Sequence, residues 1–352
     1  MINLMMDSGA FSSFTQGKVI DLSAYCTFLK QNEKYIYKSV TLDVINPKDP
    51  NVAALAGMKN YLEMRTEGLD PIPVYHARES RKWLDEYLDI TDYVGISTTS
   101  LVSPVEARVW SRICWNYITD GEGLPIVKTH CFGDVSEYTL LTQPHTSVDA
   151  ATWMIMGGRA GRIKLSGKSY QIHTKKIGDP NFISIHDTGP KRESWEMEIR
   201  ELGLDPTFLI NLKPGIRTRG SGMAMLRSFL VAADLLRLQE QTRFATRFNN
   251  PHTLLTTKRQ MAGGQDRGGP VRMFFVLSPS AYQFNFPVLA ALKIPDILVS
   301  YYYVITAQKN FWEECMIPFL EGPAAFCERD EKIKPFWELL QSCLLKQVSA
   351  YA

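Results

Sequence analysis

The chain has 352 residues, 45% of them hydrophobic and 22% charged, with a formal net charge of +2 at pH 7. This composition indicates a globular protein with ample material for a core, and the length allows one large α/β domain or two smaller ones. No run reaches the roughly 18 apolar residues of a membrane span, and no basic segment before an apolar stretch marks a secretory signal. The six cysteines are scattered without CxxC or CxC pairs. That pattern indicates reduced thiols, a cytoplasmic location and no zinc site.

The first 158 residues alternate apolar runs with helical patterns, joined by short connections. Strands are predicted at residues 2–6, 36–44, 71–75, 93–96, 125–129 and 146–148, and helices at 22–30, 52–66, 80–88, 105–118 and 136–141. At the fourth helix, Ser103 supplies an N-cap and Pro104 the first helical position. Strands separated by helices predict parallel pairing through right-handed crossovers. Six such units suit either a (β/α)₈ barrel or a doubly wound sheet.

The residues at the strand ends help to choose between these two folds. Each predicted strand has a polar side chain at its end or just beyond: Asp7, Asp43, His76, Ser97, His130 and Asp149. In a barrel all these ends meet at one mouth, whereas in an open sheet only the ends beside the switch point meet. No GxGxxG sequence follows the first strand, which weakens a dinucleotide-binding fold. We therefore predict an α/β fold of the (β/α)₈ barrel class.

After Asp149 the alternation stops and the sequence becomes basic and irregular. Residues 159–273 carry twenty Lys and Arg against ten Asp and Glu. Such concentrated positive charge predicts a polyanionic partner, although a solvated surface that merely segregates charge gives the same count. A long helix is predicted at 223–244. Regular structure is then predicted at 271–277, 286–293 and 297–305, with terminal helices at 311–319 and 334–347.

This pattern divides the chain into three parts. Residues 1–158 form the first six β/α units and carry the active site. Residues 159–270 form a basic elaboration of the late barrel, with a surface for nucleic acid. Residues 271–352 supply the remaining barrel elements and the C-terminal helices.

Three acids stand at predicted strand ends: Asp7, Asp43 and Asp149. A buried cluster of carboxylates is destabilising unless it is paired, protonated or used in chemistry. Taken singly, Asp7 could be a solvated acid in a tight turn, Asp43 could start a turn before a proline, and Asp149 could cap the next helix. Taken together at the mouth of one barrel, the three acids predict a catalytic site.

The segments around these acids resemble the tRNA-guanine transglycosylase superfamily in order and approximate spacing over residues 2–165. They are Asp7-Ser8-Gly9-Ala10-Phe11-Ser12, Leu42-Asp43, Val74-Tyr75-His76, Val94-Gly95-Ile96-Ser97 and Val148-Asp149-Ala150. The chain departs from the family where Ala10 replaces a glycine and where Ser12 and His76 replace glutamines. The PTR sequence and the zinc site of the tRNA enzymes have no counterpart. The chain is therefore most similar to the DpdA branch of phages and bacteria, which residues 278–304 also resemble.

The resemblance implies a barrel that exchanges guanine in DNA for a free 7-deazaguanine base such as preQ0, without cofactor, metal or membrane. Exchange without hydrolysis calls for double displacement. By resemblance, Asp149 is the nucleophile and Asp7 the acid and base. Asp43 accepts hydrogen bonds from the base, and Phe11 stacks on it. The other base-binding residues that the resemblance implies are Ser8 and Gly9, with their thin backbone, His76, and Gly95 through its N–H group.

The predicted DNA contacts are Arg159, Arg162 and Lys164, because they follow Asp149 most closely in the basic segment. His130 and Trp153 each have a structural reading and a functional one, the latter as a stacking residue for a flipped nucleotide. Three rival functions stay open: exchange on tRNA, a nucleic-acid-binding barrel with an inactive site, and hydrolysis of a glycosidic bond. The sequence does not specify which deazaguanine is inserted, the strandedness of the DNA or the oligomeric state.

Overall fold

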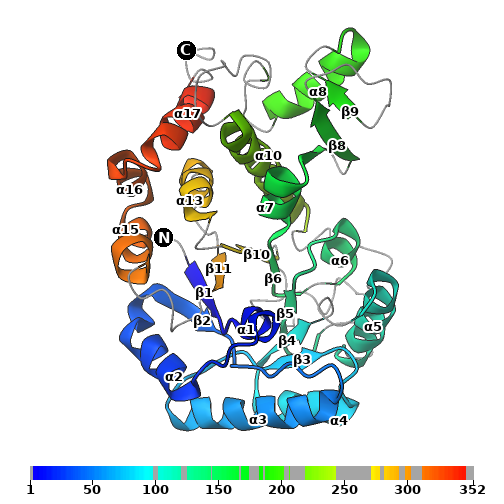
Figure 1. The fold of residues 1–352 in the computed structure, drawn as a ribbon. Coiled ribbons are helices and arrows are strands. Elements are labelled where there is room, and N and C mark those ends of the chain that lie inside the picture. The colour runs from blue at the N-terminus through cyan, green and yellow to red at the C-terminus, as the bar shows by residue number, and fades with distance from the viewer. Residues whose placement is uncertain are drawn as a thin grey trace, which may run out of the picture. The chain divides into compact units, whose positions relative to one another are not determined.

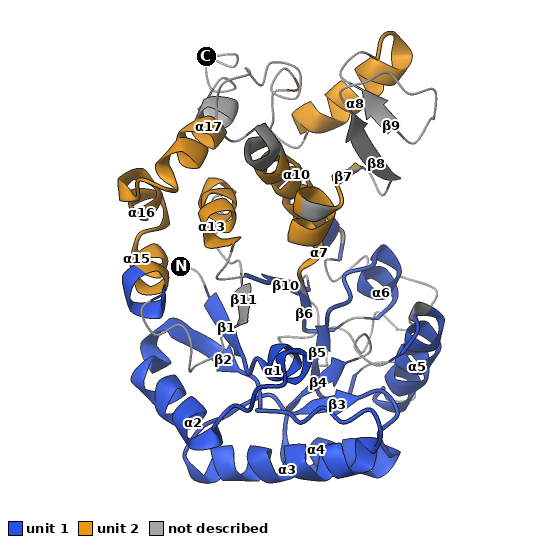
Figure 2. Ribbon diagram, viewed as in Figure 1, with its two compact units in different colours: residues 1–150, 238–279, 296–314 blue, residues 151–237, 280–295, 315–352 orange. Residues whose placement is uncertain are grey.

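The computed structural model describes residues 3–97, 102–119, 125–143, 145–165, 168–173, 182–184, 187–201, 206, 219–242, 271–277, 281–292, 298–302 and 311–345. The chain divides into two compact units (Figure 2). Unit 1 comprises residues 1–150, 238–279 and 296–314, and unit 2 comprises residues 151–237, 280–295 and 315–352. The three-part division expected from the sequence stays a prediction. Every helix in the described ranges is too short or too polar to cross a lipid bilayer.

Unit 1 is built on a parallel sheet. Its strands are β1 (Asn3–Asp7), β2 (Ile36–Ser39), β3 (Val74–His76), β4 (Tyr93–Ser97), β5 (Lys128–Phe132), β6 (Ser147–Ala150), β10 (Arg272–Phe275) and β11 (Leu298–Tyr302). They lie in the order β2-β1-β11-β10-β6-β5-β4-β3, and all the pairings are parallel. An isolated parallel bridge also joins Val40, directly after β2, to Ile72, just before β3. The α/β class and the parallel pairing are confirmed, and closure into a barrel stays a prediction.

The helices of unit 1 connect these strands in chain order. They are α1 (Ala10–Gln16), α2 (Leu22–Gln31), the 3₁₀ helix η1 (Glu33–Tyr35), α3 (Pro50–Thr66), α4 (Arg81–Ile90), α5 (Pro104–Tyr117) and α6 (Glu137–Thr142). Figure 1 shows α2, α3, α4 and α5 on the outer side of the strands. The predicted start of α5 is confirmed, because Ser103 and Glu106 form a reciprocal capping box before Pro104. Helix α1 was not predicted; it begins directly after Gly9, whose φ of 74° is left-handed.

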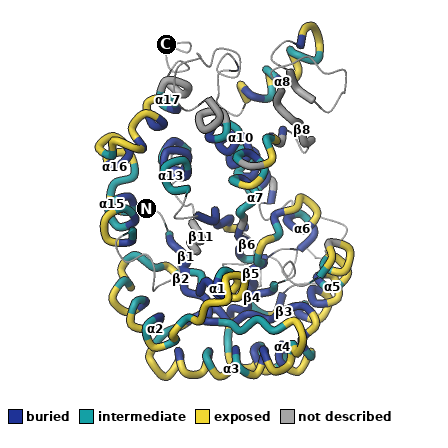
Figure 3. Tube along the Cα trace, in the orientation of Figure 1, coloured by how far each residue is buried: buried dark blue, intermediate teal, exposed yellow. Residues whose placement is uncertain are grey.

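Two clusters of buried side chains hold unit 1 together. One consists of residues from the strands and their extensions: Met5, Val40, Ile72, Val74, Tyr93 and Phe274, with Phe132 packed against it. The other lies where α3, α4 and α5 pack on β3 and β4, and includes Tyr61, Trp83, Tyr87, Val94 and Trp115. Figure 3 shows the resulting pattern, with buried strands and helices exposed along their outer faces. The strand residues are therefore fixed on both sides.

Unit 2 contains regular elements where the sequence indicated an irregular basic segment. They are α7 (Thr152–Met154), the π-helix η2 (Ile155–Arg159), β7 (Arg162–Leu165), β8 (Lys168–His173), β9 (Phe182–Ser184), α8 (Pro190–Glu201) and most of α10 (Arg219–Gln241). Strand β7 pairs antiparallel with β8, which pairs parallel with β9. Gly157 of η2 lies against α10, because a Cβ there would stand 2.4 Å from the backbone nitrogen of Ser228.

The rest of unit 2 is helical. It comprises α13 (Tyr282–Ala291), α15 (Ile317–Glu321), α16 (Pro323–Arg329) and α17 (Lys334–Leu345), and the π-helix η4 (Trp312–Met316) leads into it. Phe286 of α13 stacks on Phe319 of α15 with a centroid separation of 3.9 Å. The helices expected near residues 223–244, 286–293, 311–319 and 334–347 are confirmed, within a few residues at their ends.

Candidate active site

A pocket of about 190 Å³ opens in unit 1 at the carboxyl ends of the strands. It is lined by Asp7, Phe11, Val40, Asp43, Ile45, Val74, His76, Ser97, Phe132 and Gly133. A cavity of about 150 Å³ is known to hold benzene, so this volume suits a somewhat larger flat ring system. The lining combines two aromatic rings and aliphatic walls with a small number of polar groups, as ligand pockets commonly do.

Asp7 is the last residue of β1 and lies on the pocket wall. Burial raises the pKa of its carboxyl group well above the usual range, and the nearby charges of Asp43 and Asp149 raise it further. The backbone N–H groups of Ser8 and Gly9 donate to the carboxyl group and oppose this shift without cancelling it. Asp7 therefore keeps its proton to a higher pH than an ordinary aspartate and can donate it to a ligand.

Asp43 lies beyond β2 in a connection that leads to α3, and both of its oxygens have partners. Ser8 Oγ donates to Oδ1 at 2.9 Å, and His76 Nε2 lies 2.9 Å from Oδ2. The turn that follows is made by Asn46, whose side-chain oxygen accepts from the N–H groups of Lys48 and Asp49. The role of Asp43 as a turn starter is thus filled by another residue.

His76 ends β3 and lies between two carboxylates. Its Nδ1 is 2.9 Å from Glu79 Oε1, and its backbone N–H donates to Glu79 Oε2 at 3.1 Å. Burial alone would lower the pKa of His76, but the hydrogen bonds and charges of Asp43 and Glu79 raise it to about 10. The ring is therefore an imidazolium at neutral pH, and its Nε2–H faces Oδ2 of Asp43.

Glu79 is a site residue that the sequence analysis missed. Its side chain is 2% exposed, and it reaches His76 because Arg78 adopts a left-handed backbone with φ of 75°. Tyr75 Oη donates to the Glu79 carbonyl oxygen and fixes the same turn. An acid three residues after a strand-end histidine was the available signal. The direction of the Glu79 side chain depends on a backbone conformation that the sequence does not reveal.

Asp149 is the third residue of β6 and is buried, with a side-chain exposure of 2%. Gly133, which lines the pocket, donates its N–H to Asp149 Oδ1 at 2.5 Å. Burial raises the pKa of Asp149 to about 7, although the hydrogen bond from Gly133 opposes the shift. Asp149 caps no helix, because α7 begins after Ala151 without a side-chain cap. The pocket wall contains Asp7 and Asp43, and Asp149 stands behind Gly133.

His130 lies inside β5 and not at its end, because this strand begins at Lys128, three residues later than predicted. The side chain is fully buried, with Nδ1 at 2.5 Å from Ser147 Oγ and Nε2 at 3.8 Å from Asp149 Oδ1. Burial lowers the pKa of His130 to about 3, so the ring is neutral. His130 thus contacts the predicted nucleophile from the interior of the sheet.

Gly95 does not have the free N–H group that its predicted role requires. That N–H donates to the carbonyl oxygen of Pro73 at 2.8 Å. A Cβ at Gly95 would stand 2.5 Å from the ring of Phe132 and 3.1 Å from the Pro73 oxygen. The contacts therefore favour the packing role, in which glycine lets Phe132 reach the pocket wall. Phe11 does line the pocket, from helix α1, with 44% of its surface exposed.

The predicted nucleic-acid contacts belong to unit 2. Arg162 is exposed at the start of β7. Arg159 and Lys164 lie in η2 and β7, and their side chains are outside the described residues. Trp153 in α7 is fully buried, which favours its structural reading. The predicted contacts of these three basic residues with DNA stay predictions.

Within the described ranges, no three or more His, Cys, Asp or Glu side chains are grouped as a metal site would require. Cys26, Cys114, Cys131 and Cys327 are free thiols. Comparisons with models of protein families, with curated proteins and with solved structures gave no match for this chain.

Proposed function

We propose that the chain is a DNA-guanine transglycosylase that exchanges guanine for a 7-deazaguanine base on a (β/α)₈ barrel. The observation that carries this proposal is the set of three carboxyl groups at one pocket. Asp7 and Asp43 line it, and Asp149 is held directly behind its wall by Gly133. Paired carboxyl groups with separated proton affinities are what base exchange at a glycosidic carbon needs.

An isolated bridge beside the two outermost strands supports closure of the sheet. In an open sheet β2 and β3 would lie at opposite edges, roughly 34 Å apart at about 4.8 Å per strand. The parallel bridge between Val40 and Ile72 instead brings their extensions together. The cluster that includes Met5, Tyr93 and Phe274 places side chains from distant strands in one interior. Both observations favour a barrel, whose active site belongs at the carboxyl ends of the strands.

The protonation states support a double displacement. In the first step Asp149 attacks C1′, the C1′–N9 bond breaks with its electron pair on guanine, and guanine takes the proton of Asp7. In the second step the incoming base gives its N9 proton to Asp7 and displaces the carboxylate from C1′. Asp7, with its raised pKa, supplies the proton. Asp149 has a pKa of about 7, so a large fraction of it is a carboxylate near neutral pH.

Recognition of the base falls to Asp43. Guanine and 7-deazaguanines both present an N1–H and an exocyclic amine on one edge, and an ionised carboxylate accepts from such a pair. The imidazolium of His76 and the hydroxyl of Ser8 each contact one oxygen of Asp43 and fix its orientation. Phe11 supplies a ring face for stacking on the base.

The choice of DNA as substrate has separate support. The positive charge of residues 159–273 suits a phosphate backbone, and Arg162 is exposed there. The zinc ligands that the tRNA enzymes of the superfamily carry have no counterpart in the sequence. The resemblance to the DNA-modifying branch adds to this preference.

The decisive experiment incubates the purified chain and radiolabelled guanine with guanine-containing DNA or with tRNA. We expect label to enter DNA, and Asp149→Asn to abolish that incorporation. Label in tRNA alone would favour the tRNA enzyme, and release of guanine without incorporation would favour a hydrolase. Binding of DNA without any exchange would favour the inactive-barrel alternative. Each of these last three results overturns the proposal.

A further inference from the structure

His130 stands behind the proposed nucleophile and has no part in the reaction written above. Its ring is fully buried between Phe132 and Phe274, with centroid separations of 4.4 and 5.6 Å. Nε2 points toward Asp149 Oδ1 at 3.8 Å and has no hydrogen-bond partner among the described residues. Buried polar atoms are almost always paired, so an unpaired nitrogen aimed at a reactive carboxyl group calls for an explanation.

The contacts on the other side of the ring indicate which nitrogen carries the proton. Ser147 Oγ lies 2.5 Å from His130 Nδ1 and 2.5 Å from Tyr93 Oη. Ser147 has one proton to give. If it donates to Nδ1 and accepts from Tyr93, the ring proton lies on Nε2 and faces the carboxylate of Asp149. The reverse direction would set the Nε2 lone pair against that carboxylate, which is repulsive.

We propose that His130 is a positioning residue whose Nε2–H, with the N–H of Gly133, holds Oδ1 of Asp149 and leaves Oδ2 to attack C1′. This inference rests on the proposed function. Both groups face the same oxygen, Oδ1. An oxygen that accepts two hydrogen bonds is the poorer nucleophile, so the other oxygen forms the bond. The separation of 3.8 Å is longer than a hydrogen bond, and such contacts tighten when substrate fills a site.

The proposal assigns every bond in the two steps. The Oδ2 lone pair forms the bond to C1′, and the C1′–N9 pair leaves on guanine with the proton of Asp7. When the incoming base attacks, it returns a proton to Asp7, and the C1′–Oδ2 pair returns to Asp149. Donors on Oδ1 stabilise the free carboxylate more than the ester. The proton of His130 therefore favours the second step, in which the carboxylate leaves.

Other titratable groups near Asp149 must be considered with His130. Asp7 on β1 and Cys131 on β5 both interact electrostatically with the Asp149 charge. Burial raises the pKa of Cys131 well above the usual range, so its thiol is neutral. Burial and the charges of Asp43 and Asp149 raise the pKa of Asp7. Neither group supplies a hydrogen-bond donor to Oδ1, so the effect of His130 can be measured apart from theirs.

The test uses three variants of the full chain. His130→Phe removes both ring nitrogens, and His130→Gln keeps a donor close to the position of Nε2. Ser147→Ala keeps the ring and removes the hydroxyl that fixes its tautomer. In the parent, NMR of ¹⁵N-labelled histidine should show His130 protonated on Nε2 and unprotonated on Nδ1, with the variants providing the assignment.

The second readout is the pKa of Asp149, measured in each background from the pH dependence of the stability change caused by Asp149→Asn. We expect His130→Phe to raise that pKa by about one unit, a tenfold change in proton affinity. Ser147→Ala should raise it less, and His130→Gln should leave it close to the parent value. With DNA present, His130→Phe should also accumulate more covalent adduct and release it more slowly.

These results separate the inference from the function on which it rests. A ring protonated on Nδ1, or an Asp149 pKa that does not move in His130→Phe, overturns the inference even if exchange is observed. If His130→Phe does not fold, the tautomer of the parent and the pKa shift in Ser147→Ala decide the question. If exchange is absent while the tautomer of His130 and the pKa shift of Asp149 are as expected, the proposed function is wrong. The coupling of His130 to Asp149 is then still supported.

Discussion

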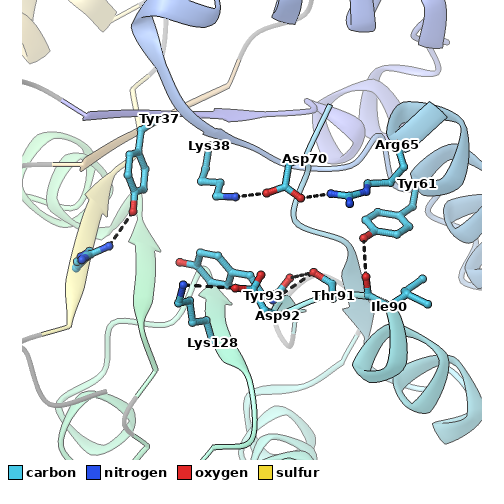
Figure 4. A network of polar contacts seen from close by, with 11 residues as sticks. Tyr37, Lys38, Tyr61, Arg65, Asp70, Ile90, Thr91, Asp92, Tyr93 and Lys128 are labelled. Atoms are coloured by element: carbon cyan, nitrogen blue, oxygen red, sulfur yellow. Dashed lines mark hydrogen bonds and ion pairs between the residues drawn. The ribbon is translucent and has the colours of Figure 1, made fainter. Parts of the chain in front are cut away.

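Acidic residues at the two ends of the strands in unit 1 differ in their burial and in their charged partners. At the amino ends, Asp70 binds Lys38 at 2.5 Å and also pairs with Arg65, and Asp92 lies 3.5 Å from Lys128 (Figure 4). These acids are exposed, at 58% for Asp70 and 79% for Asp92. At the carboxyl ends, Asp149 is buried and Asp7 is partly buried on the pocket wall. In the described part of the chain neither has a lysine or arginine partner.

The difference shows where the protein tolerates groups that destabilise its folded state. Exposed ion pairs such as those at the amino ends contribute at most about 1 kcal/mol each. Carboxyl groups buried beside one another destabilise the folded state, and their pKa values rise so that they take up protons. The amino ends thus hold acids in water with partners, whereas the carboxyl ends hold acids in the state that proton transfer requires. Perturbed groups that gather in one pocket are typical of a functional site.

The largest expected effect comes from removing the acids of the carboxyl ends. Asp149→Asn and Asp7→Asn should each reduce guanine exchange by roughly 10³-fold or more, because in the proposed reaction each removes a group that bonds to or protonates the reacting atoms. Asp149→Asn should also prevent the covalent adduct on denaturing gels. The matched variants Asp70→Asn and Asp92→Asn should exchange guanine at nearly the parental rate. Equal losses of exchange activity from substitutions at both ends would contradict the proposed difference between the two ends.

The next effect separates recognition of the base from the chemistry. Asp43→Ala should raise the apparent KM for the incoming base by roughly 30- to 1000-fold, since a charge-assisted pair is worth about 2–4 kcal/mol. Binding of DNA should change little, because the proposed function assigns this carboxylate to the base and not to the DNA backbone. Titrations of base and of DNA against the variant measure the two separately. A fall in DNA affinity with unchanged base affinity would assign Asp43 to another task.

A smaller effect concerns stability and its dependence on pH. The folded-state pKa of Asp149 is about 7, above the ordinary 3.8, so the folded state binds the proton more tightly than the unfolded state. Stability is therefore lost as pH rises from about 4 to 7. Asp149→Asn removes this loss, and it should stabilise the protein by up to about 4 kcal/mol at pH 8. Thermal melts should show the gain shrinking steadily toward pH 5.

The smallest effect is expected at the amino ends. Asp70→Asn should lower the free energy of unfolding by about 1 kcal/mol or less, because both of its partners are in solvent. The loss should be similar from pH 6 to pH 8, and added salt should reduce it further. Denaturant titrations at low and high salt measure this change. A gain in stability from Asp70→Asn, like that expected of Asp149→Asn, would contradict the assignment of the two ends.

The sequence predicted much of unit 1 because its strands and helices alternate cleanly. Asp7 and His76 end their strands as expected, and residues far apart in the chain, Asp7 and Asp43, line one pocket. The sequence could not place Glu79, because its contact with His76 depends on the left-handed backbone at Arg78. It could not show that the N–H of Gly95 is taken by Pro73, since that bond depends on strand register.

Two further differences have equally local causes. His130 was assigned to a strand end because the predicted strand stops at residue 129, whereas β5 runs from Lys128 to Phe132. The strands of unit 2 were missed because charge hides their alternation: Ile163 and Leu165 of β7 are fully buried, yet basic residues stand beside them in the sequence. Helix α1 was not predicted because its small and polar residues suggested a loop.

The place of β1 in the sheet has a consequence for how the chain is made. β1 pairs with β2 on one side and with β11 on the other, so Asp7 stands opposite Tyr302 (Figure 1). A ribosome adding about 5–20 residues per second needs roughly 15–60 s to pass from the first strand to the last. Throughout that time the nascent β1 has an open edge, which is a template for wrong pairing. The acid at its end therefore reaches its buried state only when synthesis is almost complete, and chains that stop before Leu298 leave that edge open.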